Sequence, residues 1–475
     1  MSIAIVWFRH DLRCYDNPAL SEASNNHEFI IPLYIHSPEL LGAAQNWWLH
    51  HSLNSLEKEL KKFGLHLCLK RGNALSIIQE LIKKHKIDAI YWNRCYEPAV
   101  IERDKNIKEQ LKNTGLEVTS FNGSLFNEPW TIKNKGGAYF KVFTPYWRHC
   151  QKETSLPEIS PVIPRRSPDS MHSDSISNWN LLPQNPNWAE GFSDYWEPGE
   201  LGALKKLDLF IESQLHDYKT VRNEPAKQGT SRLSPHIHFG EISPWYIWKA
   251  ITEATLQPDC DIRSAEQFLA ELGWREFSYY LLYHFPELPE KNFRPEFDHF
   301  PWQDDALHLK HWQKGTTGFP IVDAGMRELW HTGYMHNRVR MITASFLVKD
   351  LLIDWRKGAD WFYHTLLDAD LANNSASWQW VAGTGADSAP YFRIFNPTRQ
   401  GEQFDPQGDY VRRWVPELSQ VPNKWIHKPW EAPSHELPII LGKEYPYPLI
   451  EHTLARRVAL EQYQKIKSSK KPLKA

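Results

Sequence analysis

The segment LHLCLKRGNALSIIQELIKKHKIDAIYWNR (65–94) places an amphipathic stretch between two short apolar runs. The runs at 65–72 and 88–94 have the length of buried strands, and 73–86 has apolar residues at helical spacing. This alternation is typical of a parallel sheet covered by helices on both faces. It continues in both directions, with strand-like runs at 3–8, 29–36 and 116–123 and a helical stretch at 47–64. We therefore predict a doubly wound, Rossmann-like α/β domain over residues 1–130.

The ligand of this domain is not evident from its sequence. No G-x-G-x-x-G follows the first strand-like run, IAIVWF (3–8), so the usual dinucleotide signature is missing. Doubly wound sheets still bind ligands at the carboxyl ends of their strands. A ligand site in this domain therefore remains possible without that signature.

The rest of the chain changes character twice. Residues 131–204 are predicted to form a connector, because their second half is rich in Pro, Ser and Asn and lacks periodicity. From 205 to 465 apolar residues recur at helical spacing, notably at 264–285 and 322–355, which predicts an all-α domain. Residues 466–475 are predicted to be a disordered basic tail. The predicted fold class is thus α/β plus all-α.

The overall composition is that of a globular protein and excludes several classes. The 475 residues carry a formal net charge of -2, so any nucleic-acid surface must be a local basic patch. No apolar run is long enough to span a bilayer, and no signal peptide is evident. The five scattered cysteines argue against disulfides and zinc clusters, and no metal site is predicted. We expect a reduced, cytosolic protein.

Aromatic residues are unusually numerous, with 22 Trp, 19 Tyr and 22 Phe. They either fill the core or form a pocket or stacking surface for a planar ligand, and composition does not distinguish these alternatives.

The stretch GTSRLSPHIHFGEISP (229–244) has the residue types of a diphosphate cradle. Small residues let backbone amides approach an anion, hydroxyls donate hydrogen bonds, and Arg232 brings positive charge. A plain turn followed by a helix cap is the commoner meaning of such a segment.

Two helical stretches carry polar side chains beside large aromatic or apolar ones. In FLAELGWREFSYY (268–280), Glu271 and Trp274 are three apart and share a helix face. This could be a stacking platform with a hydrogen-bonding partner, or simply a half-buried Trp beside a surface Glu. In GYMHNRVRM (333–341), Asn337 and Met341 align, and the long hydrophobic helix predicted to follow at 341–355 suggests a cavity rim.

The run DADLANNSASWQW (368–380) concentrates Asp, Asn and Trp in thirteen positions. Asp and Asn favour helix caps and turns, so the run is either an ordinary helix start with core tryptophans or a functional site.

Taken together, these motifs resemble the DNA photolyase/cryptochrome family, and most closely its class I cyclobutane pyrimidine dimer photolyases of bacteria. The resemblance begins at VWFRHDLRCYDNPAL (6–20) and includes GTSRLSPHIHFGEISP. It is densest from TGFPIVDAGMREL (317–329) to NPTRQGEQFDPQGDYVRRWVPEL (396–418). It implies an α/β domain, a connector and a helical domain that holds FAD. It also implies a lyase activity: light-driven repair of pyrimidine dimers in UV-damaged DNA, through electron transfer from reduced, anionic FAD.

The resemblance assigns the flavin contacts by position. The segment 230–234 and Tyr218 match contacts to the phosphates and ribityl chain, and Asn374 matches the residue that faces flavin N5. Asn373 is the alternative, and the four-residue spacing to Trp378 favours Asn374. The full set of matched flavin-binding residues is Tyr218, Thr230, Ser231, Arg232, Leu233, Ser234, Arg275, Arg340, Asp368, Asp370 and Asn374.

The same resemblance assigns an electron relay and a DNA site. Trp378, Trp355 and Trp302 match the inner, middle and outer members of the relay to the flavin, with Trp312 as a competitor for the outer position. Enzymes of this family flip the dimer out of the stack before repair. The residues that match contacts to the dimer or its DNA strand are Glu271, Trp274, Asn337, Arg338, Met341, Trp380 and Gln400. Of these, Glu271, Asn337 and Met341, with Asn374, are the expected catalytic group.

Three further expectations rest on the resemblance. Many relatives carry a second light-harvesting chromophore; here methenyltetrahydrofolate is the first choice and a deazaflavin the second, with Glu102 as a candidate folate contact. The protein is expected to be a monomer that needs no membrane and that lies in the bacterial cytosol or nucleoid. A cryptochrome-type photoreceptor that signals through protein partners is the alternative function, and a generic flavoprotein redox enzyme is the third.

Overall fold

The computed structural model describes residues 2–37, 41–155, 157–169, 171–258 and 260–469. They form two compact units, each made from several segments of the chain. The first unit contains residues 1–216, 231–286 and 367–369. The second contains residues 217–230, 287–366 and 370–475. Because each unit collects distant segments, the predicted boundaries near 130, 204 and 465 stay predictions.

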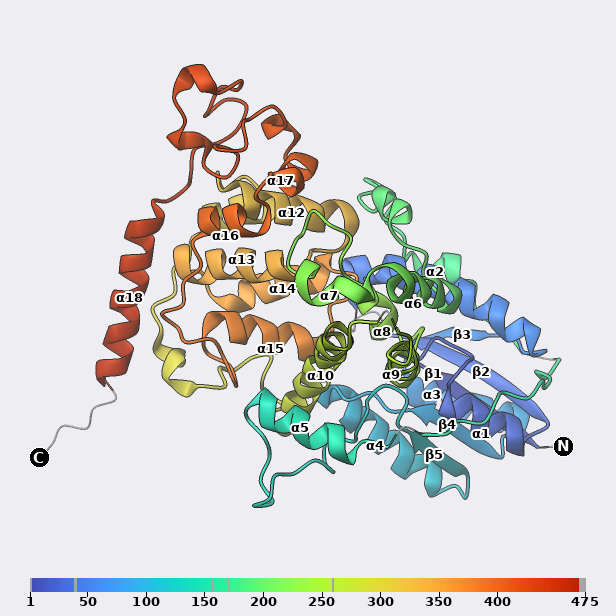
Figure 1. The fold of residues 1–475 in the computed structure, drawn as a ribbon. Coiled ribbons are helices and arrows are strands. Elements are labelled where there is room, and N and C mark those ends of the chain that lie inside the picture. The colour runs from blue at the N-terminus through green and yellow to red at the C-terminus, as the bar shows by residue number, and fades with distance from the viewer. Residues whose placement is uncertain (1, 38–40, 156, 170, 259, 470–475) are drawn as a thin grey trace, which may run out of the picture. The chain divides into compact units, whose positions relative to one another are not determined.

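The first unit is built on a five-stranded parallel sheet with the order β3-β2-β1-β4-β5 (Figure 1). All five predicted strands are confirmed, and the bounds are β1 (Ile3–Phe8), β2 (Phe29–His36), β3 (Cys68–Arg71), β4 (Ala89–Asn93) and β5 (Glu117–Phe121). The chain adds strands to one side of β1 and then crosses to the other side. Right-handed crossovers therefore place the first two connecting helices on one face and the next two on the other.

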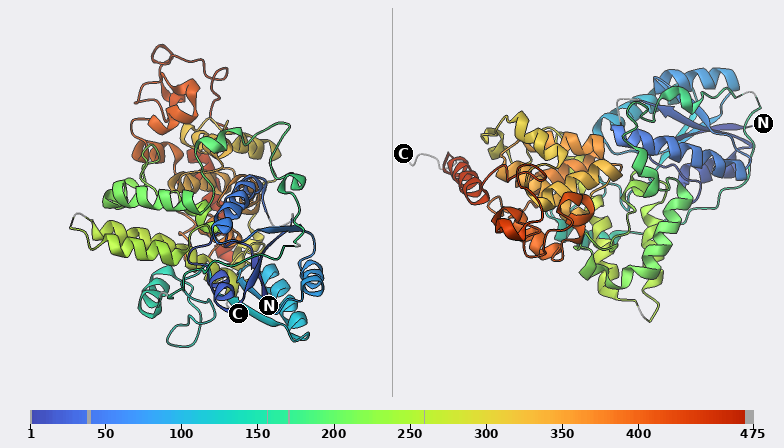
Figure 2. Two further views of the ribbon diagram at one scale, coloured as in Figure 1. Left: turned by 90° about the vertical axis from the view of Figure 1, so that its right-hand side faces the viewer. Right: turned by 90° about the horizontal axis from the view of Figure 1, so that it is seen from above.

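Buried side chains account for this layering. Ile5 and Trp7 of β1 share an apolar cluster with Ile78 of α3 (Ala74–His85) and Ile107 of α4 (Pro98–Lys112). The remaining helices of this unit are α1 (Pro18–Asn26), α2 (Ala43–Lys62), α5 (Phe143–Glu153), α6 (Glu200–Ser213), α8 (Ser234–His238), α9 (Pro244–Ala254) and α10 (Ile262–His284). Helix α9 packs against both α6 and α10. Figure 2 shows these green to yellow-green helices from two further directions. The predicted connector is not free of helices, because Phe143, Tyr146 and Trp147 bury one face of α5.

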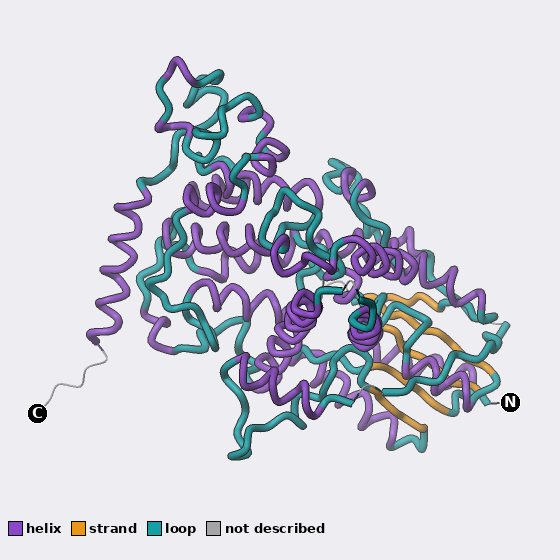
Figure 3. The backbone as a smooth tube through the Cα atoms, viewed as in Figure 1, coloured by secondary structure: helices purple, strands orange, loops and turns teal. Residues whose placement is uncertain are grey.

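The second unit is helical, and Figure 3 shows the strands confined to the sheet described above. Its main helices are α7 (Tyr218–Val221), α11 (Ala306–Lys314), α12 (Pro320–Thr332), α13 (Asn337–Ser345), α14 (Trp355–Thr365), α15 (Leu371–Ala382), α16 (Pro397–Phe404), α17 (Asp409–Trp414) and α18 (His452–Ser469). No helix in the described ranges is both long and apolar enough to cross a membrane.

The apolar stretch 322–355 is divided, which corrects the long helix expected at 341–355. Gly333 ends α12 in a left-handed conformation, and the side chain of His336 then caps α13 by accepting from the Arg338 amide. After Ser345 the backbone continues as a single π-helical segment, Phe346–Asp350. Periodicity records only which side chains are buried, so it did not reveal these breaks.

Helix α18 corrects the predicted tail. It continues to Ser469, so residues 466–469 are helical, while 470–475 lie outside the described residues. Ala459 and Ile466 join an apolar cluster with Phe297, and His452 Nδ1 lies 2.7 Å from Asp350 Oδ1. Tertiary packing therefore holds a helix whose sequence is strongly basic.

Candidate functional site

The predicted phosphate segment forms a tight turn in the first unit. Arg232 has a φ of 51°, a left-handed conformation that non-glycine residues adopt rarely. Leu233 donates its amide to Ser231 Oγ at 3.4 Å, and Ser234 Oγ donates to Asp368 Oδ2 at 2.5 Å. The last contact joins two predicted flavin residues that are 134 positions apart in the chain.

The start of this segment lies in the second unit. Gly229 passes so close to α7 that a Cβ there would lie 2.7 Å from Val221 Cγ2. Tyr218 is buried, and the Arg222 guanidinium lies 5.4 Å from the centre of its ring. A glycine is therefore needed at 229 for close packing against α7, the helix that carries Tyr218.

Helix α10 carries the predicted aromatic platform. The Trp274 indole stacks on Phe143 of α5, with centroids 3.8 Å apart and an interplanar angle of 12°. Gly273 allows this approach, because a Cβ there would lie 2.6 Å from the Trp147 ring. Glu271 is half-buried and accepts a hydrogen bond from Gln267 Nε2 at 2.8 Å. The two helices thus fix the orientation of the Trp274 ring.

Arg275 is held by the loop after β5. Its Nη1 donates to the Ser124 carbonyl at 2.8 Å and lies 3.3 Å from Glu276 Oε1. Glu276 is fully buried, and this burial raises the pKa of its carboxyl to about 8. The Phe126 amide donates to the other Glu276 oxygen at 2.9 Å.

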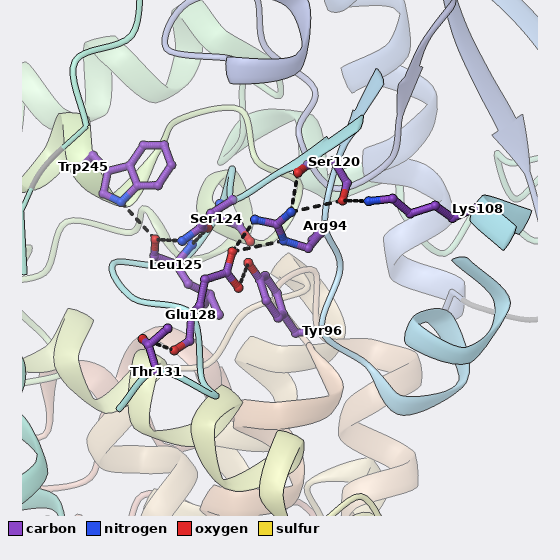
Figure 4. A network of polar contacts seen from close by, with 10 residues as sticks. Arg94, Tyr96, Lys108, Ser120, Ser124, Leu125, Glu128, Thr131 and Trp245 are labelled. Carbon is purple, nitrogen blue, oxygen red and sulfur yellow. Dashed lines mark hydrogen bonds and ion pairs between the residues drawn. The ribbon is translucent and has the colours of Figure 1, made fainter. Parts of the chain in front are cut away.

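Further contacts pin the same loop, as Figure 4 shows. The Trp245 indole N–H donates to the Leu125 carbonyl at 2.9 Å. Glu128 accepts hydrogen bonds from Arg94 and, at 3.0 Å, from the Tyr96 hydroxyl. Anchored by residues that directly follow β4 and by Trp245 of α9, the loop presents a fixed carbonyl to Arg275.

Helix α13 arranges four predicted residues in the second unit. Arg338 Nη2 donates to Asn223 Oδ1 at 2.7 Å, and its guanidinium lies 4.5 Å from the Phe404 ring centre. Arg340 Nε donates to the Met335 carbonyl at 2.7 Å. Asn337 is exposed in the first turn and Met341 is half-buried one turn later.

The DADLANN run (368–374) caps helix α15, and hydrogen bonds fix the orientation of its two asparagine side chains. Asp370 caps α15 by accepting from the Asn373 amide, and Asn373 Nδ2 donates back to Asp370 Oδ2 at 2.7 Å. Asn374 Nδ2 instead donates to the Ala359 carbonyl of α14 at 2.8 Å. Each amide thus donates through its Nδ2 to a group of the protein, and the choice of Asn374 over Asn373 stays a prediction.

The tryptophans are found in different surroundings. Trp378 is buried against Gly358, where a Cβ would lie 2.2 Å from the indole, and its ring centroid is 6.2 Å from that of Trp312. The Trp355 indole N–H donates to Asn292 Oδ1 at 2.9 Å. Trp302 packs against Phe300, with centroids 4.3 Å apart. Among the described residues, Trp312 thus makes a ring contact with Trp378, the inner member of the proposed relay.

The remaining predicted residues are accessible. Trp380 on α15 and Gln400 on α16 are half-buried in the second unit, and Glu102 on α4 is exposed in the first.

The structure also reveals positioning residues that the sequence reasoning missed. Gln45 of α2 donates to the Ala369 carbonyl, directly after Asp368, and its amide nitrogen lies 3.0 Å from His238 Nε2. Trp48 donates to Glu241 at 2.9 Å. The bond from Gln45 to Ala369 holds the Asp368 segment against α2. No local motif marks Gln45, because its partner is 324 residues away.

The doubly wound sheet and the helical unit are the two parts that the resemblance to DNA photolyases and cryptochromes predicts. Comparison with protein families agrees. Residues 4–165 match the DNA photolyase family model, and residues 268–465 match the FAD binding domain of DNA photolyase.

Individual relatives extend this similarity to the whole chain. The deoxyribodipyrimidine photo-lyase of Agrobacterium fabrum is 50% identical, with 98% of each chain covered. Cryptochrome-2 of Arabidopsis thaliana is 38% identical, over 96% of this chain and 77% of its own. A crystal structure of a bacterial class III photolyase from Agrobacterium tumefaciens superposes with a TM-score of 0.95 at 50% identity, covering 98% of both chains.

The chain belongs to the DNA photolyase/cryptochrome family. The predicted fold and flavin-binding domain are confirmed. The expected class I membership is not confirmed, because the matched structure is that of a class III photolyase. Motifs shared across the family do not separate its classes, which explains the difference.

Proposed function

We propose that this protein repairs cyclobutane pyrimidine dimers in DNA with blue light, as a carbon–carbon lyase. The observation that carries the proposal is 50% identity to a deoxyribodipyrimidine photo-lyase along nearly the whole of both chains. The more distant match to cryptochromes makes light signalling the second candidate.

The predicted flavin-contacting residues of each unit carry hydrogen-bonding and charged groups that suit FAD. Segment 231–234 combines hydroxyls with the Arg232 guanidinium and contains no carboxylate, which suits a diphosphate. Asp368 is oriented by Ser234 and suits a hydroxyl or ring N–H donor. Thr230, Leu233, Arg275, Arg340 and Asp370 complete the proposed set with Tyr218 and Asn374. When bound in its reduced, anionic form, FAD would supply the electron that blue light makes available for repair.

Asn374 controls protonation near flavin N5 in this proposal. Its Nδ2 is already directed to the Ala359 carbonyl, so Oδ1 is the atom left to accept from a ligand N–H. A neutral amide cannot deliver a proton readily, and Asn374 therefore favours the anionic cofactor.

The dimer site uses stacking and polar contacts. Trp274 and Trp380 would supply aromatic walls for the flipped dimer. Glu271, in its protonated form, would donate a hydrogen bond to a base carbonyl and stabilise the added charge. Asn337 would contact a base edge, with Met341 packed beside it. Arg338 and Gln400 would contact the strand, so binding should weaken with salt.

The relay Trp302, Trp355 and Trp378 would prepare the cofactor by photoreduction and takes no part in dimer cleavage. Indoles suit this task because they are oxidisable and pack well in a dry interior.

A second chromophore would feed light to the active site. Methenyltetrahydrofolate is the first candidate, with Glu102 as a contact, and a deazaflavin is the second. A related structure, the photolyase of Sulfolobus tokodaii, carries two FAD molecules and matches with a TM-score of 0.82 at 31% identity, over 98% of this chain and all of its own. Mass spectrometry of the chromophores released from the purified protein distinguishes these candidates.

We further infer that a monomer acts on damaged DNA. Light scattering of the purified protein with and without a dimer-containing duplex tests this directly. A stable dimer without DNA would contradict it.

The decisive experiment follows thymine absorbance in UV-irradiated oligothymidylate. The photoreduced protein is illuminated with blue light, and an identical sample is kept dark. Recovery in light only supports repair. No recovery from protein that spectrally holds reduced FAD would contradict repair and favour a photoreceptor.

A further inference from the structure

The second unit contains a large cavity that shares no residue with the proposed flavin, relay or DNA sites. Its volume is about 1040 Å³, which is ample for a nucleotide-sized ligand. The residues that line it come from α11, α12, α14 and α17 and the turn after α11, and they are Ala306, Lys310, Gln313, Lys314, Thr316, Arg327, Trp330, His331, Trp361, Arg413 and Trp414.

The charge of this lining has one sign. It includes two lysines and two arginines and no carboxylate. Arg327 is compensated by Glu417, with Nη1 to Oε1 at 2.8 Å. In the described part of the chain, Lys310, Lys314 and Arg413 form no ion pair, and all three are exposed. For a chain with a net charge of -2, this is a local positive patch that suits an anion.

The wall of the cavity is aromatic. Trp330 of α12 stacks on Trp361 of α14, with centroids 6.0 Å apart and planes only 7° from parallel. Trp330 keeps 50% of its surface exposed. His331 and Trp414 lie close together on another side, with centroids 5.9 Å apart. A core packing role alone does not explain a large indole left half exposed beside unpaired cations.

We propose that this cavity binds a nucleotide, with the base stacked on the Trp330–Trp361 pair and the phosphate held by Lys310, Lys314 and Arg413. An indole face accepts any base, and cations beside it neutralise phosphate. The shared chemistry fits either a free nucleoside phosphate or one unit of a single strand. An acidic peptide would use the cations but gain nothing from the stacked indoles, so a nucleotide is favoured.

The test uses the full chain saturated with FAD, so that the flavin's adenosine site is filled. Isothermal titration calorimetry at low salt measures binding of ADP and, separately, of undamaged hexathymidylate. Trp330→Ala, and separately Lys314→Glu, should weaken binding by about tenfold, the size expected for losing one base stack or one phosphate contact. Trp330→Phe keeps an aromatic face and should retain most of the affinity.

A matched control lies outside the cavity. Lys58→Glu changes an exposed lysine of α2 and should leave the binding of both probes unchanged. Binding of either probe that Trp330→Ala and Lys314→Glu both weaken supports the proposal, and the probe that binds identifies the source. No saturable binding, binding insensitive to Trp330→Ala and Lys314→Glu, or tighter binding of hexaglutamate would overturn it, the last in favour of an acidic protein partner. The repair assay is unaffected by these outcomes, so the two proposals fail separately.

Discussion

The indole of Trp378 lies edge-on to that of Trp312, with ring centroids 6.2 Å apart and planes at 70°. Phe362 packs edge-on to Trp378 and face-on to Trp312, with centroids at 5.0 and 5.9 Å. Both indoles are almost completely buried. Trp312 is therefore a real alternative to the relay members proposed from the sequence.

Substitutions can distinguish an electron route that runs from Trp378 through Trp355 and Trp302 from one that runs from Trp378 through Trp312. Trp378→Phe should slow photoreduction of bound FAD at least about tenfold on either route, because both begin at Trp378. Trp302→Phe and Trp355→Phe should slow it similarly if the proposed relay operates, whereas Trp312→Phe should then have little effect. Absorbance of FAD during illumination measures all four rates. The reverse ranking would contradict the proposed relay.

Removing the Ser234 hydroxyl should weaken flavin binding. Ser234→Ala leaves Asp368 without its 2.5 Å donor, so the carboxylate loses its orientation. Hydrogen bonds to charged groups contribute about 1.5–3 kcal/mol, and we expect the FAD dissociation constant to rise about tenfold. Fluorescence of released FAD measures this. Ser213→Ala, at an exposed position of α6, is the control, and equal affinities for both variants would refute the role of Ser234.

Substitution of Glu271 should lower the quantum yield of repair more than it lowers the affinity for DNA. Glu271→Ala removes the proposed hydrogen-bond donor to the base carbonyl, and we expect the quantum yield to fall about tenfold. Glu271→Gln keeps a donor and should lose less. Both are compared with Glu266→Gln, an exposed residue of the same helix. An undiminished yield for Glu271→Gln would exclude an ionisation role, and an undiminished yield for Glu271→Ala would exclude the contact.

The buried Glu276 makes stability depend on pH. Its pKa is about 8 in the folded protein against an ordinary value of 4.5, so between these values the native state holds a proton that the unfolded state releases. This contribution is fully present below about pH 4.5 and is lost as pH rises to about 8. Urea unfolding at pH 5, 7 and 9 should show a smaller decline in unfolding free energy for Glu276→Gln. A decline equal to that of the unmodified protein would contradict this assignment.

The packing of helix α18 should contribute to stability through the contact of its His452 with Asp350. His452→Ala removes the 2.7 Å partner of a carboxylate that is buried in the π-helical segment, where burial raises the pKa of Asp350 to about 6. We expect a loss of about 1–3 kcal/mol in unfolding free energy. Thermal unfolding measures it, with His435→Ala, a histidine with 83% of its side chain exposed, as the control. Equal melting temperatures for the two variants would show that packing alone holds α18.

The strands and most helices could be predicted because the side chains that they bury give the sequence a local, periodic spacing of apolar residues. Alternating short apolar runs and amphipathic stretches specified the sheet at 3–8, 29–36 and 88–94. Helix breaks that depend on one backbone conformation, such as Gly333 before α13, do not alter the spacing of apolar residues and so could not be predicted from it. The motifs likewise identified the family, but not the class within it.

The sequence by itself determined the doubly wound sheet, the helical flavin domain and the residue types of the site, because these follow from local patterns and motif order. Only the tertiary structure decided which distant groups meet. Ser234 reaches Asp368, Trp274 stacks on Phe143, and Trp330 lies on Trp361. Each contact joins helices or turns that no sequence period relates, so it depends on how those elements pack within their unit.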